Sequence, residues 1–291
     1  MSSGSFKIES ITHADMICRA VTFGINKAKL PVGRMVFLSM LAGMYIGFGC
    51  LLSTVITTGA GGILPYGVTR VLGGLIFCLG LILVVVGGAE LFTGNSLMVI
   101  AWIDGKISMV SMLRNWLFVY FGNFLGAVIL AGLVFLSREY RFGQGEVGKT
   151  ILNLALVKVN YPFLQALALG ILCNVLVCLA VWMTYGGSSI ADKIAAIIFP
   201  ITAFVAAGFE HSVANMYALP LGWMIRAFDP AYATSTALNL SQLTWQRILV
   251  NNLLPVTLGN IIGGAFFVGA IYAAVYLPIK STKPSSSSQS R

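Results

Sequence analysis

Gly88-Ala-Glu-Leu-Phe-Thr-Gly-Asn95 and Gly208-Phe-Glu-His-Ser-Val-Ala-Asn215 lie in the middle of two apolar stretches, 70–103 and 190–224, each about 35 residues long. A single straight helix needs only about 20 apolar residues to cross a bilayer. Both segments carry glycine, glutamate and asparagine at matching places, at an offset of 120 residues. The pattern predicts two transmembrane helices that are broken near mid-membrane.

The composition places the rest of the chain in the membrane as well. Of 291 residues, 58% are hydrophobic and only 9% are charged, whereas soluble domains carry about 25% charged residues. This excludes a soluble enzyme and a disordered protein, and the scattered bases behind the net charge of +9 exclude a nucleic-acid binder. We predict an all-α integral membrane protein with six spans, the second and fifth of them broken: 35–57, 70–103, 111–136, 163–185, 190–224 and 249–278.

The third and sixth predicted spans also resemble each other. They share four residue pairs at an offset of 137, namely Asn115/Asn252, Gly122/Gly259, Asn123/Asn260 and Gly126/Gly263. Three spans followed by three similar spans must run through the membrane in opposite directions. The sequence therefore predicts an inverted 3+3 repeat, about 35–136 and 163–278, of the kind that places a transported substrate at the midplane.

The flanks of the spans predict the domain organisation and the orientation. Eleven Lys and Arg residues lie on the side of the two termini and seven on the other side, so the positive-inside rule places both termini in the cytoplasm. We expect a cytoplasmic N-terminal segment at 1–34, a channel domain at 35–278 and a disordered C-terminal tail at 279–291. Segment 1–34 has seven charges and no apolar core of a signal peptide.

The two breaks present chemistry suited to an anion. Each second half-helix, predicted to begin near Gly94 and Ser212, exposes unpaired backbone N–H groups and the positive end of its dipole. Two such ends converging on one point favour a small anion. Thr93 and His211 lie at these points, and a titratable histidine inside a span is a functional candidate. The alternative is a neutral imidazole that only hydrogen-bonds the broken backbone.

Other residues near the breaks have less specific signals. Glu90 and Glu210 are predicted to be structural, accepting the freed N–H groups with the support of Asn95 and Asn215. Asn123, Asn174 and Asn260 either line a path or bridge helices. A final set of apolar residues could form dry constrictions or simply pack in the core: Phe77, Leu81, Leu91, Phe92 and Phe204.

Two further patterns are set aside. The five cysteines include no CxxC motif, so we expect neither a zinc site nor a disulfide framework, and we expect no cofactor. Gly143-Gln-Gly-Glu-Val-Gly-Lys-Thr150 matches the phosphate-binding pattern GxxxxGK[ST]. That pattern works only at a strand-to-helix turn of an α/β domain, and here it lies between two membrane spans. We interpret it as a chance match.

The chain resembles the formate–nitrite transporter family, and most of all its formate channels. The resemblance extends from Ala14 to Leu277 and rests on four segments: Ala89-Glu-Leu-Phe-Thr-Gly94, Gly170-Ile-Leu-Cys-Asn-Val-Leu-Val-Cys-Leu-Ala-Val-Trp182, Gly208-Phe-Glu-His-Ser-Val-Ala-Asn-Met216 and Leu254-Pro-Val-Thr-Leu-Gly-Asn260. It implies a homopentamer in the bacterial cytoplasmic (inner) membrane, with an aquaporin-like protomer and one pore in each.

The resemblance also implies roles for single residues. Thr93 and His211 resemble the central pore pair, and Lys158 resembles a vestibule cation that attracts anions. Phe77, Leu81, Leu91, Phe92 and Phe204 resemble the constrictions; Asn174 and Asn260 resemble polar pore-lining residues. One departure concerns the substrate: Glu90 and Gly94-Asn95 follow the nitrite-type or lactate-type variant of this segment, where formate channels usually have Asp and Thr-Ser.

These observations lead to a hypothesis of passive or proton-coupled transport of formate or a similar small anion, with a proton supplied through His211. Nitrite, hydrosulfide and lactate are the alternative substrates, and passage of the anion past a neutral His211 is the alternative mechanism. Two other classes fit less well. An aquaglyceroporin should carry paired Asn-Pro-Ala motifs, which are absent here, and a membrane enzyme would need a metal cluster or a nucleophile–base pair.

Overall fold

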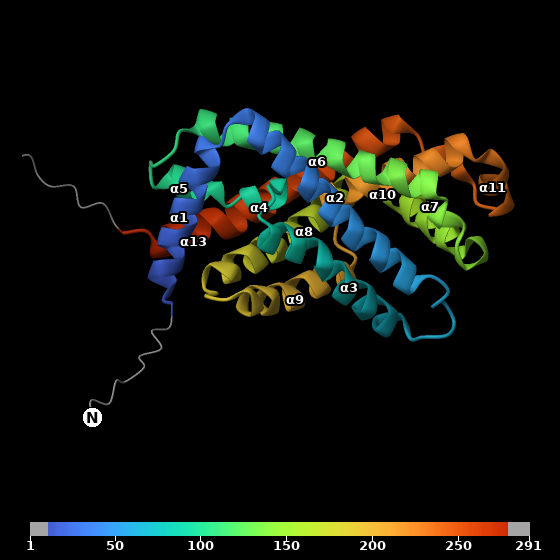
Figure 1. The fold of residues 1–291 in the computed structure, drawn as a ribbon, viewed down its shortest axis with the longest axis horizontal. Coiled ribbons are helices and arrows are strands. Elements are labelled where there is room, and N and C mark those ends of the chain that lie inside the picture. Colours follow the sequence, from blue (N-terminus) through green and yellow to red (C-terminus); the bar gives the residue numbers. More distant parts are fainter. Residues whose placement is uncertain (1–10, 279–291) are drawn as a thin grey trace, which may run out of the picture.

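The computed structural model describes residues 11–278, and these residues fold into helices joined by short connections (Figure 1). The predicted tail 279–291 lies outside the described residues. Six helices are long and apolar enough to cross a membrane, and they overlap the six predicted spans. They are α2 (Val32–Thr57), α3 (Tyr66–Gly87), α6 (Met109–Ser137), α8 (Phe163–Tyr185), α9 (Ile190–Ala207) and the continuous helical run Arg247–Tyr276, which comprises η4 (Arg247–Leu253), α12 (Leu254–Ile261), η5 (Ile262–Ala270) and α13 (Ile271–Tyr276).

Shorter helices complete the two long apolar stretches. α3 is followed by α4 (Phe92–Asn95) and α5 (Met98–Ile103), and α9 is followed by α10 (Ser212–Phe228). The C-caps of α3 and α9 are Gly88 and Gly208, whose φ angles are +79° and +78°. Glycine adopts this left-handed conformation without the steric cost that a side chain would add. α10 begins at the predicted residue, whereas α4 begins at Phe92, two residues earlier than predicted.

Close helix crossings hold the bundle together. α2 packs against α3 and α6, α3 against α9, and α8 against α12. At the α2–α6 crossing, a Cβ atom on Gly126 would lie 1.9 Å from the carbonyl oxygen of Met40; at the α8–α12 crossing, one on Gly259 would lie 2.3 Å from that of Leu167. Only glycine permits the backbones to come this close, as is common where membrane helices pack.

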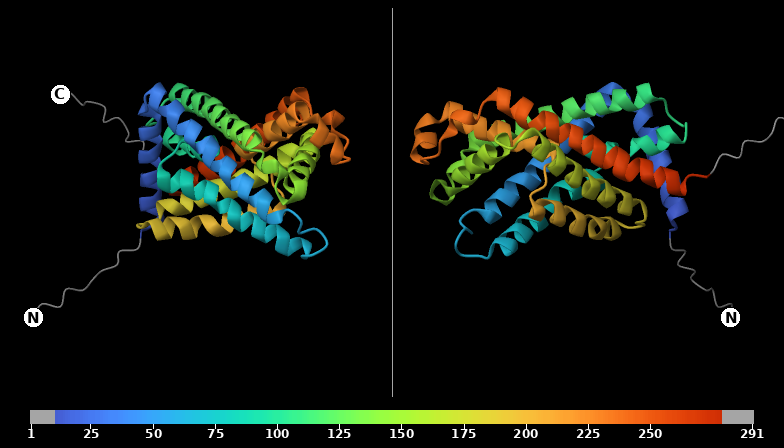
Figure 2. Two further views of the ribbon diagram at one scale, coloured as in Figure 1. Left: turned by 45° about the vertical axis from the view of Figure 1, so that its right-hand side comes forward. Right: turned by 180° about the vertical axis from the view of Figure 1, so that it is seen from behind.

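The ends of the molecule carry additional helices. α1 (His13–Lys29), within the predicted N-terminal segment, crosses one end beside α5 and α13, while α7 (Glu146–Val159) and α11 (Pro230–Ser235) lie at the opposite end (Figures 1 and 2). The connection 137–162 therefore contains a helix, and it also holds two short turns, η1 (Glu139–Arg141) and η2 (Gly143–Gly145). A further short turn, η3 (Leu240–Gln242), precedes the last span.

The GxxxxGK[ST] match lies in η2 and the first turns of α7, and it follows helical elements rather than a strand. Its glycines make room for an aromatic side chain. A Cβ atom on Gly148 would lie 2.3 Å from the hydroxyl oxygen of Tyr232, and this hydroxyl donates a hydrogen bond to the carbonyl oxygen of Gly145. The segment thus serves helix packing in this fold.

Candidate functional site

Thr93 and His211 meet at the centre of the molecule, although 118 residues separate them. The Nε2 atom of His211 lies 2.9 Å from Oγ1 of Thr93, and both side chains are buried. His211 is the N-cap of α10, and its Nδ1 atom accepts a hydrogen bond of 3.1 Å from the backbone N–H of Ala214. Because Nδ1 is an acceptor here, the proton of the neutral imidazole resides on Nε2 and is donated to Thr93. The Thr93 hydroxyl proton remains available to another acceptor.

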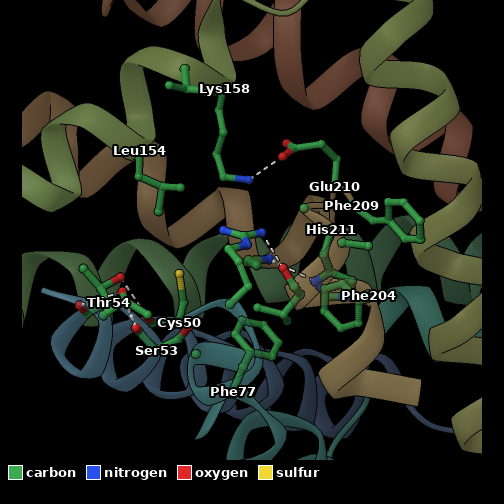
Figure 3. A pocket seen from close by; sticks show the side chains of 18 of the residues that line it. Cys50, Ser53, Thr54, Phe77, Leu154, Lys158, Phe204, Phe209, Glu210 and His211 are labelled. Carbon is green, nitrogen blue, oxygen red and sulfur yellow. Dashed lines mark hydrogen bonds and ion pairs between the residues drawn. The ribbon is translucent and has the colours of Figure 1, made fainter. Parts of the chain in front are cut away.

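Two cavities approach this pair from opposite ends. The first, which we call the α7 cavity, has a volume of about 680 Å³ and is lined by Lys158, Glu210 and His211, among others (Figure 3). The second, the α1 cavity, has a volume of about 690 Å³ and is lined by Lys27, Glu90 and Gly94, among others. Since His211 borders one cavity and the neighbour of Thr93 borders the other, the hydrogen-bonded pair lies at their boundary.

Four of the predicted constriction residues line the two cavities. Phe77 and Phe204 line the α7 cavity, and their rings meet edge to face with centroids 5.5 Å apart. Leu81 and Leu91 line the α1 cavity. All four side chains are at most 5% exposed. A bare anion crossing here loses its hydration shell, which is costly unless polar groups replace it.

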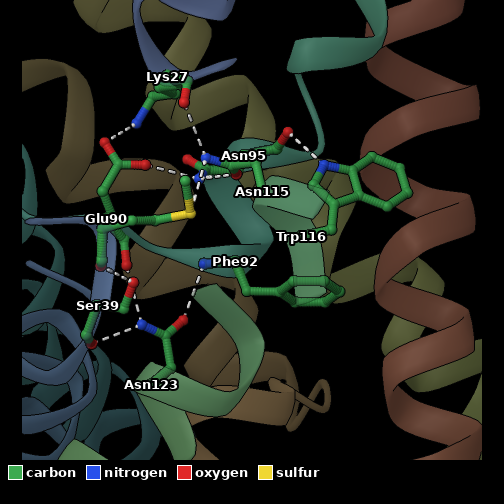
Figure 4. Close-up of polar contacts among 9 residues, drawn as sticks. Lys27, Ser39, Glu90, Phe92, Asn95, Asn115, Trp116 and Asn123 are labelled. Carbon is green, nitrogen blue, oxygen red and sulfur yellow. Dashed lines mark hydrogen bonds and ion pairs between the residues drawn. The ribbon is translucent and has the colours of Figure 1, made fainter. Parts of the chain in front are cut away.

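Phe92, the fifth predicted constriction residue, lies elsewhere. Its ring packs edge to face on Tyr120 of α6, at a centroid distance of 5.0 Å. It also packs edge to face on Trp116, at 6.3 Å (Figure 4). It borders an outer groove between α6 and α12 and neither of the two cavities. The side chain of Phe92 points away from the side of α4 on which Thr93 meets His211. It therefore anchors the start of α4 to α6.

Two asparagines satisfy the backbone at the interruptions. Asn123 Oδ1 accepts a hydrogen bond of 2.9 Å from the Phe92 N–H, and its Nδ2 donates to the carbonyl oxygens of Ser39 and Glu90 (Figure 4). Asn260 Oδ1 accepts one of 2.9 Å from the Ser212 N–H. The prediction that the two glutamates accept these N–H groups is wrong, because their carboxylates face lysine and asparagine side chains instead.

Asn260 and Asn174 make further hydrogen bonds to backbone carbonyl oxygens. Asn260 Nδ2 donates to the carbonyl oxygens of Gly170 and Glu210. Asn174 Nδ2 donates to the carbonyl oxygen of Asn260 at 2.6 Å and to that of Thr93 at 3.2 Å. Both asparagines are fully buried and border neither cavity. Of the two interpretations left open by the sequence, the contacts favour helix bridging.

Each glutamate joins a lysine to a pair of asparagines. Glu90 accepts from Lys27 Nζ at 2.7 Å and from Asn95 Nδ2 at 2.8 Å; Glu210 accepts from Lys158 Nζ at 2.5 Å and from Asn215 Nδ2 at 2.7 Å. Asn95 and Asn215 in turn donate to Asn115 and Asn252. The two networks thus pair the same residue types in the same order.

Known proteins are similar to this chain in sequence. The profile of the formate/nitrite transporter family matches residues 14–274. The chain belongs to this family. Among its relatives, the formate channel FocA of Escherichia coli K12 is 44% identical over 258 residues, which cover 87% of this chain and 90% of that protein. FocA of Haemophilus influenzae is 38% identical over 278 residues, covering 92% and 96%.

Solved structures of the family agree with the fold. A pentameric formate channel with formate bound superposes with a TM-score of 0.77 at 43% identity, covering 85% of this chain and 98% of that one. An ion channel of the family superposes with a TM-score of 0.74 at 31% identity, covering 90% and 98%. The resemblance expected from the sequence is confirmed, and the protein is a multi-pass, all-helical membrane protein of the formate/nitrite transporter family.

One further residue of the site, Lys27, was not predicted from the sequence. Lys27 occupies the same place in the first network as Lys158 does in the second. A signal for it was present: Lys27-Ala-Lys-Leu-Pro31 and Lys158-Val-Asn-Tyr-Pro162 share the spacing Lys-x-x-x-Pro before the first and fourth spans. The charge of Lys27 was counted only toward membrane orientation.

Proposed function

We propose that this protein is a channel for formate and related small monovalent anions, with one pore in each protomer of a homopentamer. The path runs from the α7 cavity, past Thr93 and His211, into the α1 cavity. The observation that carries the proposal is the Thr93–His211 hydrogen bond at the boundary between two charged cavities. Relatives named as formate channels over nearly the full chain support the choice of substrate.

The architecture that we propose is an inverted 3+3 repeat with two broken spans, α3 with α4–α5 and α9 with α10. Its support is the recurrence of residue types in the two networks, with Lys27, Glu90 and Asn123 corresponding to Lys158, Glu210 and Asn260. The channel domain would comprise 35–278. We propose that both termini face the cytoplasm and that the protein resides in a bacterial cytoplasmic membrane, as the distribution of basic residues favours.

Transport would proceed without a chemical reaction or a cofactor. A small anion collects in a cavity and loses water between the side chains of Phe77, Phe204, Leu81 and Leu91. It then accepts a hydrogen bond from the hydroxyl of Thr93. The donated bond from His211 Nε2 polarises this hydroxyl and makes it a better donor. The apolar boundary disfavours hydrated cations, because Phe77, Phe204, Leu81 and Leu91 have no side-chain oxygen that could replace their water.

The role of His211 in proton transfer needs separate treatment. To give a proton to formate through Nε2 and stay neutral, the imidazole must first carry one on Nδ1. A proton there would displace the Ala214 N–H and stand at the positive end of α10. We therefore propose that His211 acts as a neutral hydrogen-bond donor, and that formate crossing as formic acid takes its proton from a hydronium ion in the cavity, which leaves water behind.

Nitrite is the second candidate substrate, because Glu90 and Gly94-Asn95 differ from the segment usual in formate channels. Uptake of labelled formate, nitrite, hydrosulfide and lactate into liposomes containing the purified protein tests both. We expect formate to enter faster than lactate and at least as fast as nitrite. Preference for nitrite or lactate by tenfold or more would overturn the assignment, and empty liposomes provide the background rate.

A further inference from the structure

Arg70 is a fixed cation in the α7 cavity. It lies on the first turns of α3 and lines the cavity together with Lys158. Its Nε donates to the carbonyl oxygen of Ala206 at 3.0 Å, and its Nη2 donates to that of Val205 at 2.5 Å. These carbonyls belong to the last turn of α9, directly before the segment that carries His211. The guanidinium is thereby held in one place by main-chain atoms.

Among the described residues, no carboxylate forms an ion pair with Arg70. Three formally charged side chains border the α7 cavity, namely Arg70, Lys158 and Glu210. Lys158 and Glu210 form an ion pair at 2.5 Å, and the carboxylate of Glu210 is only 2% exposed. Within residues 11–278, the hydrogen bonds of Arg70 all go to carbonyl oxygens, and those at a helix C-terminus together carry about half a negative charge. The net positive charge of the cavity therefore resides on Arg70.

The α1 cavity repeats this arrangement. Lys27 is paired with Glu90, while Arg19 Nη1 donates to the carbonyl oxygens of Tyr185 and Gly187 at 2.7 and 3.3 Å, at the end of α8. Each cavity thus contains one lysine paired with a glutamate and one arginine anchored by the end of a helix. Lys193 also borders the α1 cavity. A pathway that takes anions from either end would need this positive charge on both sides.

We propose that Arg70 is the residue that makes the α7 cavity selective for anions, and that the Lys158–Glu210 pair contributes little net field. This inference rests on the proposed channel function and departs from the assignment of Lys158 as the vestibule cation. A fixed charge in a cavity that is enclosed by low-dielectric protein focuses its field on the path and raises the local anion concentration. An ion pair with its charges 2.5 Å apart acts on a distant anion mainly as a dipole.

The test compares variants that separate charge from hydrogen bonding. Arg70→Gln removes the charge and keeps an amide donor for α9, and Arg70→Lys keeps the charge. Lys158→Met combined with Glu210→Gln removes the ion pair without changing the net charge of the cavity. Lys149→Gln, which removes an exposed cation outside the cavity, is the matched control. The formate-to-sodium permeability ratio is measured from reversal potentials in planar bilayers.

We expect Arg70→Gln to lower this ratio at least about fivefold, and Arg70→Lys and the double variant to keep it within about twofold, although the double variant conducts more slowly. Lys149→Gln should leave both ratio and rate unchanged. A double variant that loses selectivity while Arg70→Gln keeps it would overturn the inference, as would equal losses in both. Size-exclusion chromatography verifies that each variant assembles. A variant that does not assemble would conduct no current, and its formate-to-sodium permeability ratio could not be measured.

Salt dependence provides a second measurement that does not depend on the ratio. Raising ionic strength should slow formate entry at low formate concentration in the wild type, since it screens Arg70, and should have about half this effect or less in Arg70→Gln. Equal salt dependence in both proteins would contradict the inference. If the wild-type protein itself carries no formate, the channel function fails, and the role of Arg70 in selectivity fails with it; if the wild type conducts, only the inference is at stake.

Discussion

His211 donates through Nε2 to the hydroxyl of Thr93 across 2.9 Å, and this direction is set by the Ala214 N–H that occupies the other ring nitrogen. The bond connects the N-cap of one helix to the side chain of another at the boundary between the two cavities. It leaves one polar hydrogen, on the Thr93 hydroxyl, free to replace water around a passing anion.

Removing this hydrogen should slow transport without disturbing the fold. Thr93→Val keeps the size of the side chain but has no donor, and a hydrogen bond to a charged group is worth about 1.5–3 kcal/mol. We expect formate uptake into liposomes to fall about 10- to 100-fold, and Thr93→Ser to retain most of it. Thr54→Val is the matched control, because this cavity-lining hydroxyl bonds within its own helix to the Cys50 carbonyl.

A neutral His211 leads to a prediction about pH. Asparagine is a good N-cap, so His211→Asn can still accept the Ala214 N–H while having no titratable group. We expect formate uptake by this variant to be slower than in the wild type but to keep the same dependence on pH between about 5 and 8. If the variant instead loses the pH dependence of the wild type, His211 relays protons. Thermal stability of the purified variant shows whether the cap is retained.

The spans and the position of the site were predictable because both depend on local composition. Apolar runs determine where helices cross the bilayer, and a glutamate within the run 70–103 or 190–224 has few explanations other than an interruption. The recurrence of such segments brought Thr93 and His211 together as candidates before any geometry was known.

The partners of these residues were harder to predict, because they are chosen by packing between distant helices. Nothing local distinguishes Asn123, which accepts the Phe92 N–H, from an asparagine that lines a path. The outward orientation of Phe92 depends on where α4 begins, and sequence placed this start two residues late. Lys27 was overlooked because its partner, Glu90, is 63 residues away.

The two bridging asparagines should be required for stability in similar measure. Asn123→Ala and Asn260→Ala each take the acceptor away from a buried backbone N–H and one donor away from two carbonyl oxygens. Each unsatisfied buried group costs about 1–3 kcal/mol, so we expect loss of about 3 kcal/mol or failure to assemble. The apparent Tm in detergent measures this. Asn251→Ala, at a partly exposed position, is the control, and a Tm within about 2 °C of the wild type in either variant would contradict the bridging role.

Two glycines on α6 provide a test of the close helix crossing. Gly126→Ala would place its Cβ 1.9 Å from the Met40 carbonyl oxygen, whereas a Cβ on Gly132 has no neighbour within 4 Å in the protomer. Overpacking of this kind costs about 1–3 kcal/mol, because neither backbone can move without shifting a whole span. We therefore expect Gly126→Ala to lower the apparent Tm by several degrees and Gly132→Ala to leave it unchanged or raise it slightly, since alanine favours the helix.

Because the α2–α6 crossing also carries Ser39 and Asn123, we expect Gly126→Ala to slow formate uptake as well. Equal Tm values for the two variants would show that the helices are not packed this closely.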